Sequence, residues 1–133
     1  FNLFPIFFFF FLITTNKKVV VPKAEISMNS GTQEIMTLGI RNVKNESLNY
    51  TLRFTTISDS SGQIERASMI QYPILFRYAS EDYVLPSGQI DVRLARIEIP
   101  KLTDIGYYAV LFEVIDNQDM SVYDKSEFFI VVK

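Results

Sequence analysis

Two asparagines, Asn45 and Asn49, have the clearest chemical potential in this chain, because each begins an Asn-x-Ser/Thr triplet completed by Ser47 and Thr51. This triplet is the acceptor for N-linked glycans, which require an exposed asparagine. Asn45 lies in a predicted hairpin turn, and strand alternation turns Asn49 away from the apolar face that carries Tyr50. We therefore expect at least one of Asn45 and Asn49 to be glycosylated. Plain surface asparagines are the alternative, since such triplets also arise by chance.

Oxygen-bearing side chains cluster in the predicted turn between the last two strands, at Asp116, Asn117, Asp119 and Asp124. Oxygen ligands that are close in sequence can hold Ca²⁺. Their spacing matches no established calcium loop, however, and turns favour Asp and Asn for conformational reasons. We therefore expect neither a metal site nor any other cofactor in this protein.

Two pairs of carboxylates, Glu81 with Asp82 and Glu98 with Asp104, have the residue type needed for acid–base catalysis. The sequence indicates no nucleophile, oxyanion donor or substrate pocket beside them. Cysteine and histidine are both absent, which excludes thiol and imidazole chemistry, a Ser-His-Asp triad and a disulfide framework. We expect that the protein is not an enzyme.

Length and charge restrict the remaining functions. The chain has 133 residues, a formal net charge of −2 and no long basic run, and its pI is near 5.1. This length suits one domain with its own core. A binding surface for nucleic acid requires clustered positive charge, so we do not expect nucleic acid as a partner.

Alternation of apolar and polar residues is the main structural signal, and no segment carries a helical period. It predicts seven strands over residues 24–28, 36–41, 48–55, 74–78, 90–99, 106–116 and 122–132. Short strands separated by turn residues are typical of an all-β sandwich. Within 90–99 the apolar parity changes between Leu94 and Ile97, which predicts a β-bulge near Ala95 and Arg96.

The first thirteen residues form an apolar segment with no charge, which holds seven of the twelve phenylalanines of the chain. A membrane-spanning helix needs about 20 apolar residues, and a signal peptide has a basic start and a small-residue cleavage site. The residue types favour a strand. The strand would carry Phe4, Ile6, Phe8, Phe10 and Leu12 on one face and Phe7, Phe9, Phe11 and Ile13 on the other.

Because both of these faces are apolar, the strand must lie inside a core. We expect residues 1–18 to be an extended arm and polar connector whose strand is donated to another copy, and residues 19–133 to be the sandwich. A truncated membrane anchor or a retained signal remnant is the alternative interpretation of residues 1–13.

Residues 102–110 resemble the Asp-x-Gly-x-Tyr-x-Cys signature that opens strand F of immunoglobulin domains. Asp104, Gly106 and Tyr108 match this signature, and Val110 stands at its cysteine position. The resemblance implies an Ig-like seven-stranded β-sandwich with a tyrosine corner, in which Tyr108 is buried and its hydroxyl bonds to backbone a few residues upstream. Val110, Phe112 and Val114 would then line the core.

A wider resemblance rests on the order of several segments: Gly-Ile-Arg-Asn at 39–42, Leu-Asn-Tyr-Thr-Leu at 48–52, Leu-Pro-Ser-Gly at 85–88 and Gly-Tyr-Tyr at 106–108. With an apolar arm ahead of the sandwich, the chain resembles subunits of archaeal threads and bundling pili, and of chaperone–usher pili. In those families one subunit completes the next by donating a strand.

This resemblance implies a structural subunit of an extracellular filament on the cell surface. Its partners would be neighbouring copies in a helical homopolymer, with cell-surface proteins as further candidates. The chain is also similar to membrane-anchored archaellum accessory proteins with an Ig-like head. That similarity implies the alternative function, a tethered Ig-like ectodomain that binds a surface-layer protein.

Overall fold

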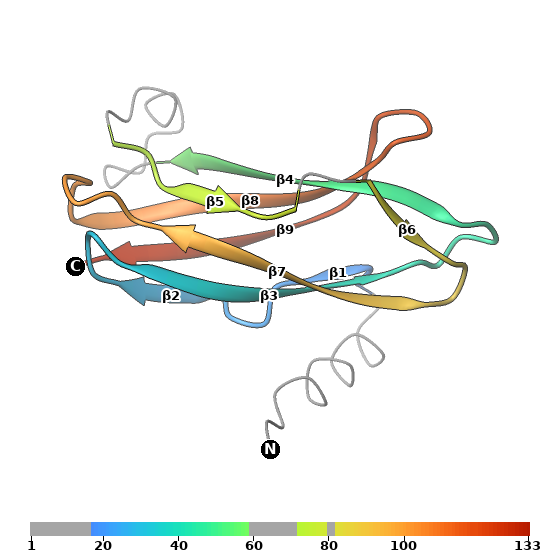
Figure 1. Cartoon of the computed structure of the whole chain (residues 1–133), viewed down its shortest axis with the longest axis horizontal. Coiled ribbons are helices and arrows are strands. Elements are labelled where there is room, and N and C mark those ends of the chain that lie inside the picture. The colour runs from blue at the N-terminus through green and yellow to red at the C-terminus, as the bar shows by residue number, and fades with distance from the viewer. Residues whose placement is uncertain (1–16, 59–71, 80–81) are drawn as a thin grey trace, which may run out of the picture.

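Two packed β-sheets form the protein in a computed structural model, which describes residues 17–58, 72–79 and 82–133 (Figure 1). The strands are β1 (Val19–Val20), β2 (Glu25–Met28), β3 (Gln33–Arg41), β4 (Leu48–Ser58), β5 (Leu75–Arg77), β6 (Tyr83–Leu85), β7 (Ile90–Glu98), β8 (Gly106–Asp116) and β9 (Ser121–Val132). No helix occurs within these described ranges.

The strand order confirms the Ig-like prediction. One sheet has the order β1-β3-β7-β5 and the other the order β2-β9-β8-β4-β6. All neighbours are antiparallel except β2 and β9, which run parallel. The chain enters the first sheet at β1 and crosses to the second at β2. These two strands therefore form one edge of each sheet. The remaining strands follow the two-sheet arrangement of immunoglobulin domains.

The space between the sheets is filled by large apolar side chains from alternate strand positions. Val110, Phe112 and Val114 on β8 are all fully buried, as the sequence predicted. The ring of Phe54 stacks on Phe76 at a centroid distance of 4.7 Å and on Phe112 at 4.9 Å. Each such side chain contributes about 2–3 kcal/mol on burial. The core therefore replaces the disulfide that antibody domains place between their sheets.

Nine strands are present in the described residues instead of the predicted seven. The seven predicted strands all form, and the additional ones are β1 and β6, with two and three residues. Such short segments show no alternation that a sequence pattern can reveal. They form because β3 and β4 offer edges with which they pair.

The predicted bulge near Ala95 and Arg96 is wrong. β7 pairs with β3 in one continuous register, from Ile90 opposite Arg41 to Glu98 opposite Gln33. Ala95 and Ile97 face the core, and unbroken alternation then directs Leu94 to the outer face of the sheet. The apolar parity changes in the sequence because two polar residues of β7, Asp91 and Arg93, take inward-facing positions.

Asp91 and Arg93 occupy the inward face of β7, where apolar residues are the rule. Asp91 accepts a hydrogen bond of 2.8 Å from the hydroxyl of Tyr50, which is fully buried. Arg93 donates to Asp91 at 3.0 Å and lies over the ring of Tyr83, 4.0 Å from its centroid. Paired in this way, the two charged groups are tolerated between the sheets.

Candidate functional site

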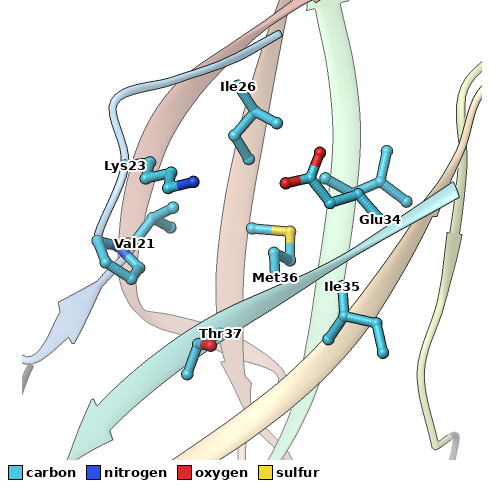
Figure 2. A pocket seen from close by; sticks show the side chains of 9 residues that line it. Val21, Lys23, Ile26, Glu34, Ile35, Met36 and Thr37 are labelled. Carbon is cyan, nitrogen blue, oxygen red and sulfur yellow. The ribbon is translucent and has the colours of Figure 1, made fainter. Parts of the chain in front are cut away.

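An apolar groove of about 240 Å³ lies between β3, β2 and the segment that joins β1 to β2 (Figure 2). Its lining residues are Val21, Pro22, Lys23, Ile26, Glu34, Ile35, Met36, Thr37 and Ile97. Three of them, Ile26, Met36 and Ile97, are buried members of the core. The floor of the groove is therefore continuous with the interior of the sandwich.

The groove exists because β1 ends early. β1 pairs with β3 only at Gly39 and Ile40, and the chain then crosses to β2 in the other sheet. Among the described residues, no strand lies beside the remaining edge of β3, residues 33–38. An unpaired strand edge is a template for another strand.

Backbone direction shows which groups this edge presents. The N–H of Arg41 donates to the carbonyl of Lys18, toward β1, at 2.7 Å. Since backbone direction alternates along an antiparallel strand, the N–H and carbonyl groups of Ile35 and Thr37 point to the same side. None of the described strands pairs with these groups on this side of β3, where a strand that lies along the groove could pair with them.

Two charged side chains flank the apolar floor. Figure 2 shows Lys23 and Glu34 extending toward each other from opposite walls of the groove, above Met36. The groove therefore offers one positive and one negative group at its mouth and apolar side chains below. This combination suits an extended peptide that inserts apolar side chains and pairs through its backbone, as in β-strand addition.

The tyrosine corner has the geometry that the sequence predicted. Tyr108 is buried, and its hydroxyl donates a hydrogen bond of 2.6 Å to the carbonyl of Asp104. Gly106 lies between them with φ of 148°, a region that only glycine enters without strain. Asp104, Gly106 and Tyr108 therefore fix the turn ahead of β8, which is a structural role.

Both predicted glycan acceptors lie at the surface, since Asn45 and Asn49 are exposed. The hydroxyl of Thr51 donates to the side-chain carbonyl of Asn117 at 3.2 Å. Attachment of glycans to Asn45 or Asn49 stays a prediction.

Asn42 organises the loop that carries Asn45, a role that was not predicted from the sequence. Its buried amide donates to the carbonyls of Glu46 and Leu85 at 2.8 and 2.9 Å. The Asn42 side-chain oxygen accepts from the N–H of Lys44 at 2.9 Å. The sequence feature that could have indicated this role is an asparagine directly after an alternating strand, because Asn side chains hydrogen-bond to backbone groups in turns.

The acidic turn binds groups of its own chain. Asp116 accepts from the ammonium of Lys44 at 2.8 Å, and Asp119 accepts from the hydroxyl of Ser121 at 2.6 Å. The second bond lowers the pKa of Asp119. Asp124 accepts from the backbone N–H of Lys18 at 3.1 Å. In the described part of the chain, no group of three metal-ligating side chains converges.

The structure describes three of the four carboxylates that the sequence pairs, and two of them contact other side chains. Glu98 forms an ion pair of 2.8 Å with Arg77. Glu81 lies outside the described residues, and Asp82 accepts from the side-chain amide of Asn117 at 3.1 Å.

The predicted donor-strand residues all lie outside the described residues: Phe4, Ile6, Phe7, Phe8, Phe9, Phe10, Phe11, Leu12 and Ile13. Within residues 17–58, 72–79 and 82–133 no helix is long and apolar enough to cross a membrane.

Comparison of the sequence with known proteins gives no family: no family model matches it, and no curated protein does. The fold, in contrast, is shared with solved structures. The chain is similar to part of a family 123 glycoside hydrolase from Clostridium perfringens, with 14% identity and a TM-score of 0.59. The match covers 82% of this chain but only 22% of the hydrolase chain, so the chain spans about a fifth of that structure.

Two further structures have a fold named after PapD or a chaperone function. One is a PapD-like domain of human CEP192, with 19% identity, a TM-score of 0.50 and coverage of 87% of this chain and 84% of that one. The other is the E. coli chaperone DraB, with 10% identity, a TM-score of 0.50 and coverage of 86% and 54%. At such identities these similarities show the fold alone: the chain forms an Ig-like, PapD-like β-sandwich.

Proposed function

We propose that the protein is a structural subunit of an extracellular filament, in which residues 4–13 of one copy bind along the β3 edge of the next copy. The observation that carries this proposal is the edge of β3 at residues 33–38, which pairs with no other described strand and lies beside an apolar groove. The arm supplies the matching chemistry, since it is an uncharged apolar segment of strand-forming residues. In this proposal the protein has no catalytic role, and its partners are copies of itself at the cell surface.

The two ends of β3 support a head-to-tail arrangement. β1, which follows the arm, lies beside Gly39 and Ile40 near the end of β3. The C-terminal Lys133 lies at the opposite end, where its carbonyl accepts from the N–H of Ser30 in the turn before β3. A strand of nine residues separates the two ends by roughly 30 Å. An arm that leaves at one end and binds near the other makes a heterologous contact, which propagates instead of closing.

The described strands already form a five-stranded sheet with β8 at its centre and β9 between β2 and β8, so in this proposal the donated arm extends a sheet and does not replace a missing core strand. The free edge spans residues 33–38, and only alternate side chains of the arm can enter the groove. Burial of two or three phenylalanines gives roughly 4–9 kcal/mol. Loss of rotational and translational freedom costs about 4–15 kcal/mol. The arm contact alone is therefore modest, and a stable polymer requires additional contacts.

Cross-linking between two variants tests this proposal, because the cysteine-free chain gives a clean background. Full-length Phe9→Cys protein is mixed with full-length Thr37→Cys protein under mild oxidation, and heterodimers are measured by mass. Thr55→Cys, at an exposed position of β4 in the other sheet, is the matched control. We expect the Phe9–Thr37 link well above the Phe9–Thr55 background. Equal yields for the two pairs would contradict the proposal.

A membrane-tethered Ig-like ectodomain that binds a surface-layer protein is the second candidate. The observation that favours this function is that the described strands of one chain form both Ig-like sheets, so the sandwich needs no strand from another copy. Flotation with phospholipid vesicles separates the two functions. A tethered ectodomain binds vesicles through residues 1–13 and stays monomeric on them, whereas a filament subunit polymerises in their absence.

A further inference from the structure

We propose that Lys18 is a positioning residue, whose contacts with both sheets direct the chain before it away from the groove of the same copy. Donation of the arm to another copy is thereby favoured over its insertion into the same chain. This inference rests on the proposed binding of residues 4–13 to the β3 edge. It concerns which copy supplies the arm that occupies that edge.

A tethered arm competes strongly for the groove of its own chain. The polar connector, residues 14–18, spans roughly 17 Å when it is extended. The free edge of β3 begins at Leu38, roughly 10 Å from Arg41 along the strand, and Arg41 bonds to Lys18. Short flexible linkers give effective concentrations in the millimolar range. A connector that turned back would therefore favour self-insertion, and donation requires a feature that opposes this turn.

Strand pairing gives the direction in which the chain approaches β1. β1 and β3 are antiparallel, with Val19 opposite Ile40. The chain before Val19 therefore leads toward Arg41 and the end of β3, whereas the groove lies beside residues 33–38, in the opposite direction. Insertion into the groove of the same chain requires the backbone to reverse at Lys18.

Both backbone groups of Lys18 are bonded, one to each sheet. Its carbonyl accepts a hydrogen bond of 2.7 Å from the N–H of Arg41, at the end of β3. Its N–H donates to the carboxylate of Asp124 on β9 at 3.1 Å. A reversal of the chain at Lys18 rotates this N–H away from Asp124 and breaks a bond that the charge of the acceptor strengthens. The contact with Asp124 therefore opposes the reversal.

Tyr123 holds the same point through its ring and its hydroxyl. The ammonium of Lys18 lies over the ring, 5.0 Å from its centroid, where a cation is attracted to the aromatic face. The hydroxyl donates to the carbonyl of Arg41 at 2.8 Å and accepts from the N–H of Val43 at 2.9 Å. These contacts fasten Lys18 and the end of β3 to β9.

A β-bulge in β9 brings both partners to Lys18. Successive side chains of a regular strand point to opposite faces of the sheet. The register of β8 and β9 shifts between Val114 and Ile115, which leaves Tyr123 unpaired in the ladder. A bulge of this kind re-aims side chains. It accounts for how the consecutive residues Tyr123 and Asp124 both contact Lys18.

Competition between two kinds of disulfide tests the role of Lys18 in the full-length protein. Chains that carry both Phe9→Cys and Thr37→Cys are equilibrated in a thiol–disulfide buffer over a range of chain concentrations. Mass spectrometry then separates intramolecular from intermolecular links. The chain concentration at which both yields are equal is the effective concentration of the arm at its own groove. We expect Asp124→Ala to raise it about tenfold, because the lost hydrogen bond has a charged acceptor.

The chain offers two matched controls and a second variant. Asp124→Asn keeps an oxygen that accepts the N–H of Lys18, so the effective concentration should stay near that of the unsubstituted anchor. Glu127→Ala removes a negative charge from an exposed position of the same strand and should also leave it unchanged. Tyr123→Phe keeps the ring under Lys18 and loses the hydroxyl contacts, so it should raise the effective concentration by a smaller factor than Asp124→Ala. It decides the question if Asp124→Ala does not fold.

Each other outcome overturns a distinct statement. An unchanged effective concentration in Asp124→Ala and Tyr123→Phe, with unchanged circular dichroism, overturns the role of Lys18 and leaves donation of the arm intact. An equal rise in Glu127→Ala assigns the effect to charge alone and also overturns it, as do mainly intramolecular links at micromolar concentration without any of these substitutions. Absence of both kinds of link above the Phe9–Thr55 background refutes the proposed function itself.

Discussion

The hydroxyl of Tyr50 on β4 donates a hydrogen bond of 2.8 Å to the carboxylate of Asp91 on β7 and so links the two sheets through a partly buried polar contact. The Nε of Arg93 donates to the same hydroxyl at 3.2 Å. Hydrogen bonds to charged partners contribute more than neutral ones. The contact also determines which face of β7 turns inward.

Tyr50→Phe should therefore destabilise the sandwich by about 1.5–3 kcal/mol, because it removes a hydrogen bond to a charged group and leaves Asp91 partly unsatisfied. The phenyl ring keeps the packing against Tyr83, whose ring centroid lies 5.1 Å away. Urea denaturation measures the loss. Tyr107→Phe is the control and should change the free energy of unfolding little, since Tyr107 is exposed. Equal effects of the two substitutions would contradict a specific role for the Tyr50–Asp91 bond.

Because the hydroxyl of Tyr50 can ionise, we expect the free energy of unfolding to fall at high pH. Burial raises the pKa of Tyr50 well above its ordinary value, and the bond to Asp91 adds to the effect. A phenol with a raised pKa in the folded state contributes stability that is complete below the pKa of the unfolded chain, about 10. That contribution is lost as the pH rises above 10. Wild-type protein should therefore lose more stability than Tyr50→Phe between pH 9.5 and pH 11, as measured by urea unfolding.

Residue patterns predicted most of the fold because most strands bury one face and expose the other. β4 and β9 alternate along much of their eleven and twelve residues. β8 is buried on both faces over most of its length, and the Asp-x-Gly-x-Tyr pattern marked the turn before it. β7 misled the prediction because Asp91 and Arg93 face inward, where their partner Tyr50 comes from a strand 41 residues away in sequence. No local pattern reveals such a partner.

The groove beside β3 was not predictable from residue types. It depends on where β1 stops pairing with β3 and where the chain crosses to the other sheet, and Val19 and Val20 are too few to show a pattern. Its lining residue Ile35 has the same residue type as many core positions. The apolar arm, in contrast, was visible at once as a segment without charge, although the sequence did not indicate its binding place.

Tyr108→Phe should cost about 1–2 kcal/mol of folding free energy, because it removes the hydrogen bond from the buried Tyr108 to the backbone carbonyl of Asp104. Thermal unfolding followed by circular dichroism measures the change. The control Tyr72→Phe alters a tyrosine that is exposed. A melting temperature equal to that of wild type would show that the corner does not stabilise the turn before β8.

Glycosylation predicts a mass above that of the bare chain, 15.4 kDa, for protein from its natural source. Asn45→Gln and Asn49→Gln should each remove the glycan attached at that position, and folding should be retained because both side chains are exposed. Intact-mass spectrometry reads out the result. A native mass equal to the bare chain would refute glycosylation at both positions.

Phe9→Asp should abolish polymerisation and leave the sandwich folded. An isolated carboxylate that enters an apolar groove without a partner costs several kcal/mol, which is comparable to the whole estimated contribution of the arm. Phe9→Leu keeps an apolar side chain of strand-compatible shape and should still polymerise, so it is the matched control. Sedimentation velocity measures assembly, and circular dichroism checks the sandwich. A second cross-linking experiment tests whether the charge acts at the groove. The arm cysteine is placed at Phe11, and its partner chain carries Thr37→Cys. Adding Phe9→Asp to the chain with the arm cysteine should abolish this cross-link. Polymers of Phe9→Asp with wild-type length would exclude the arm as the donated strand.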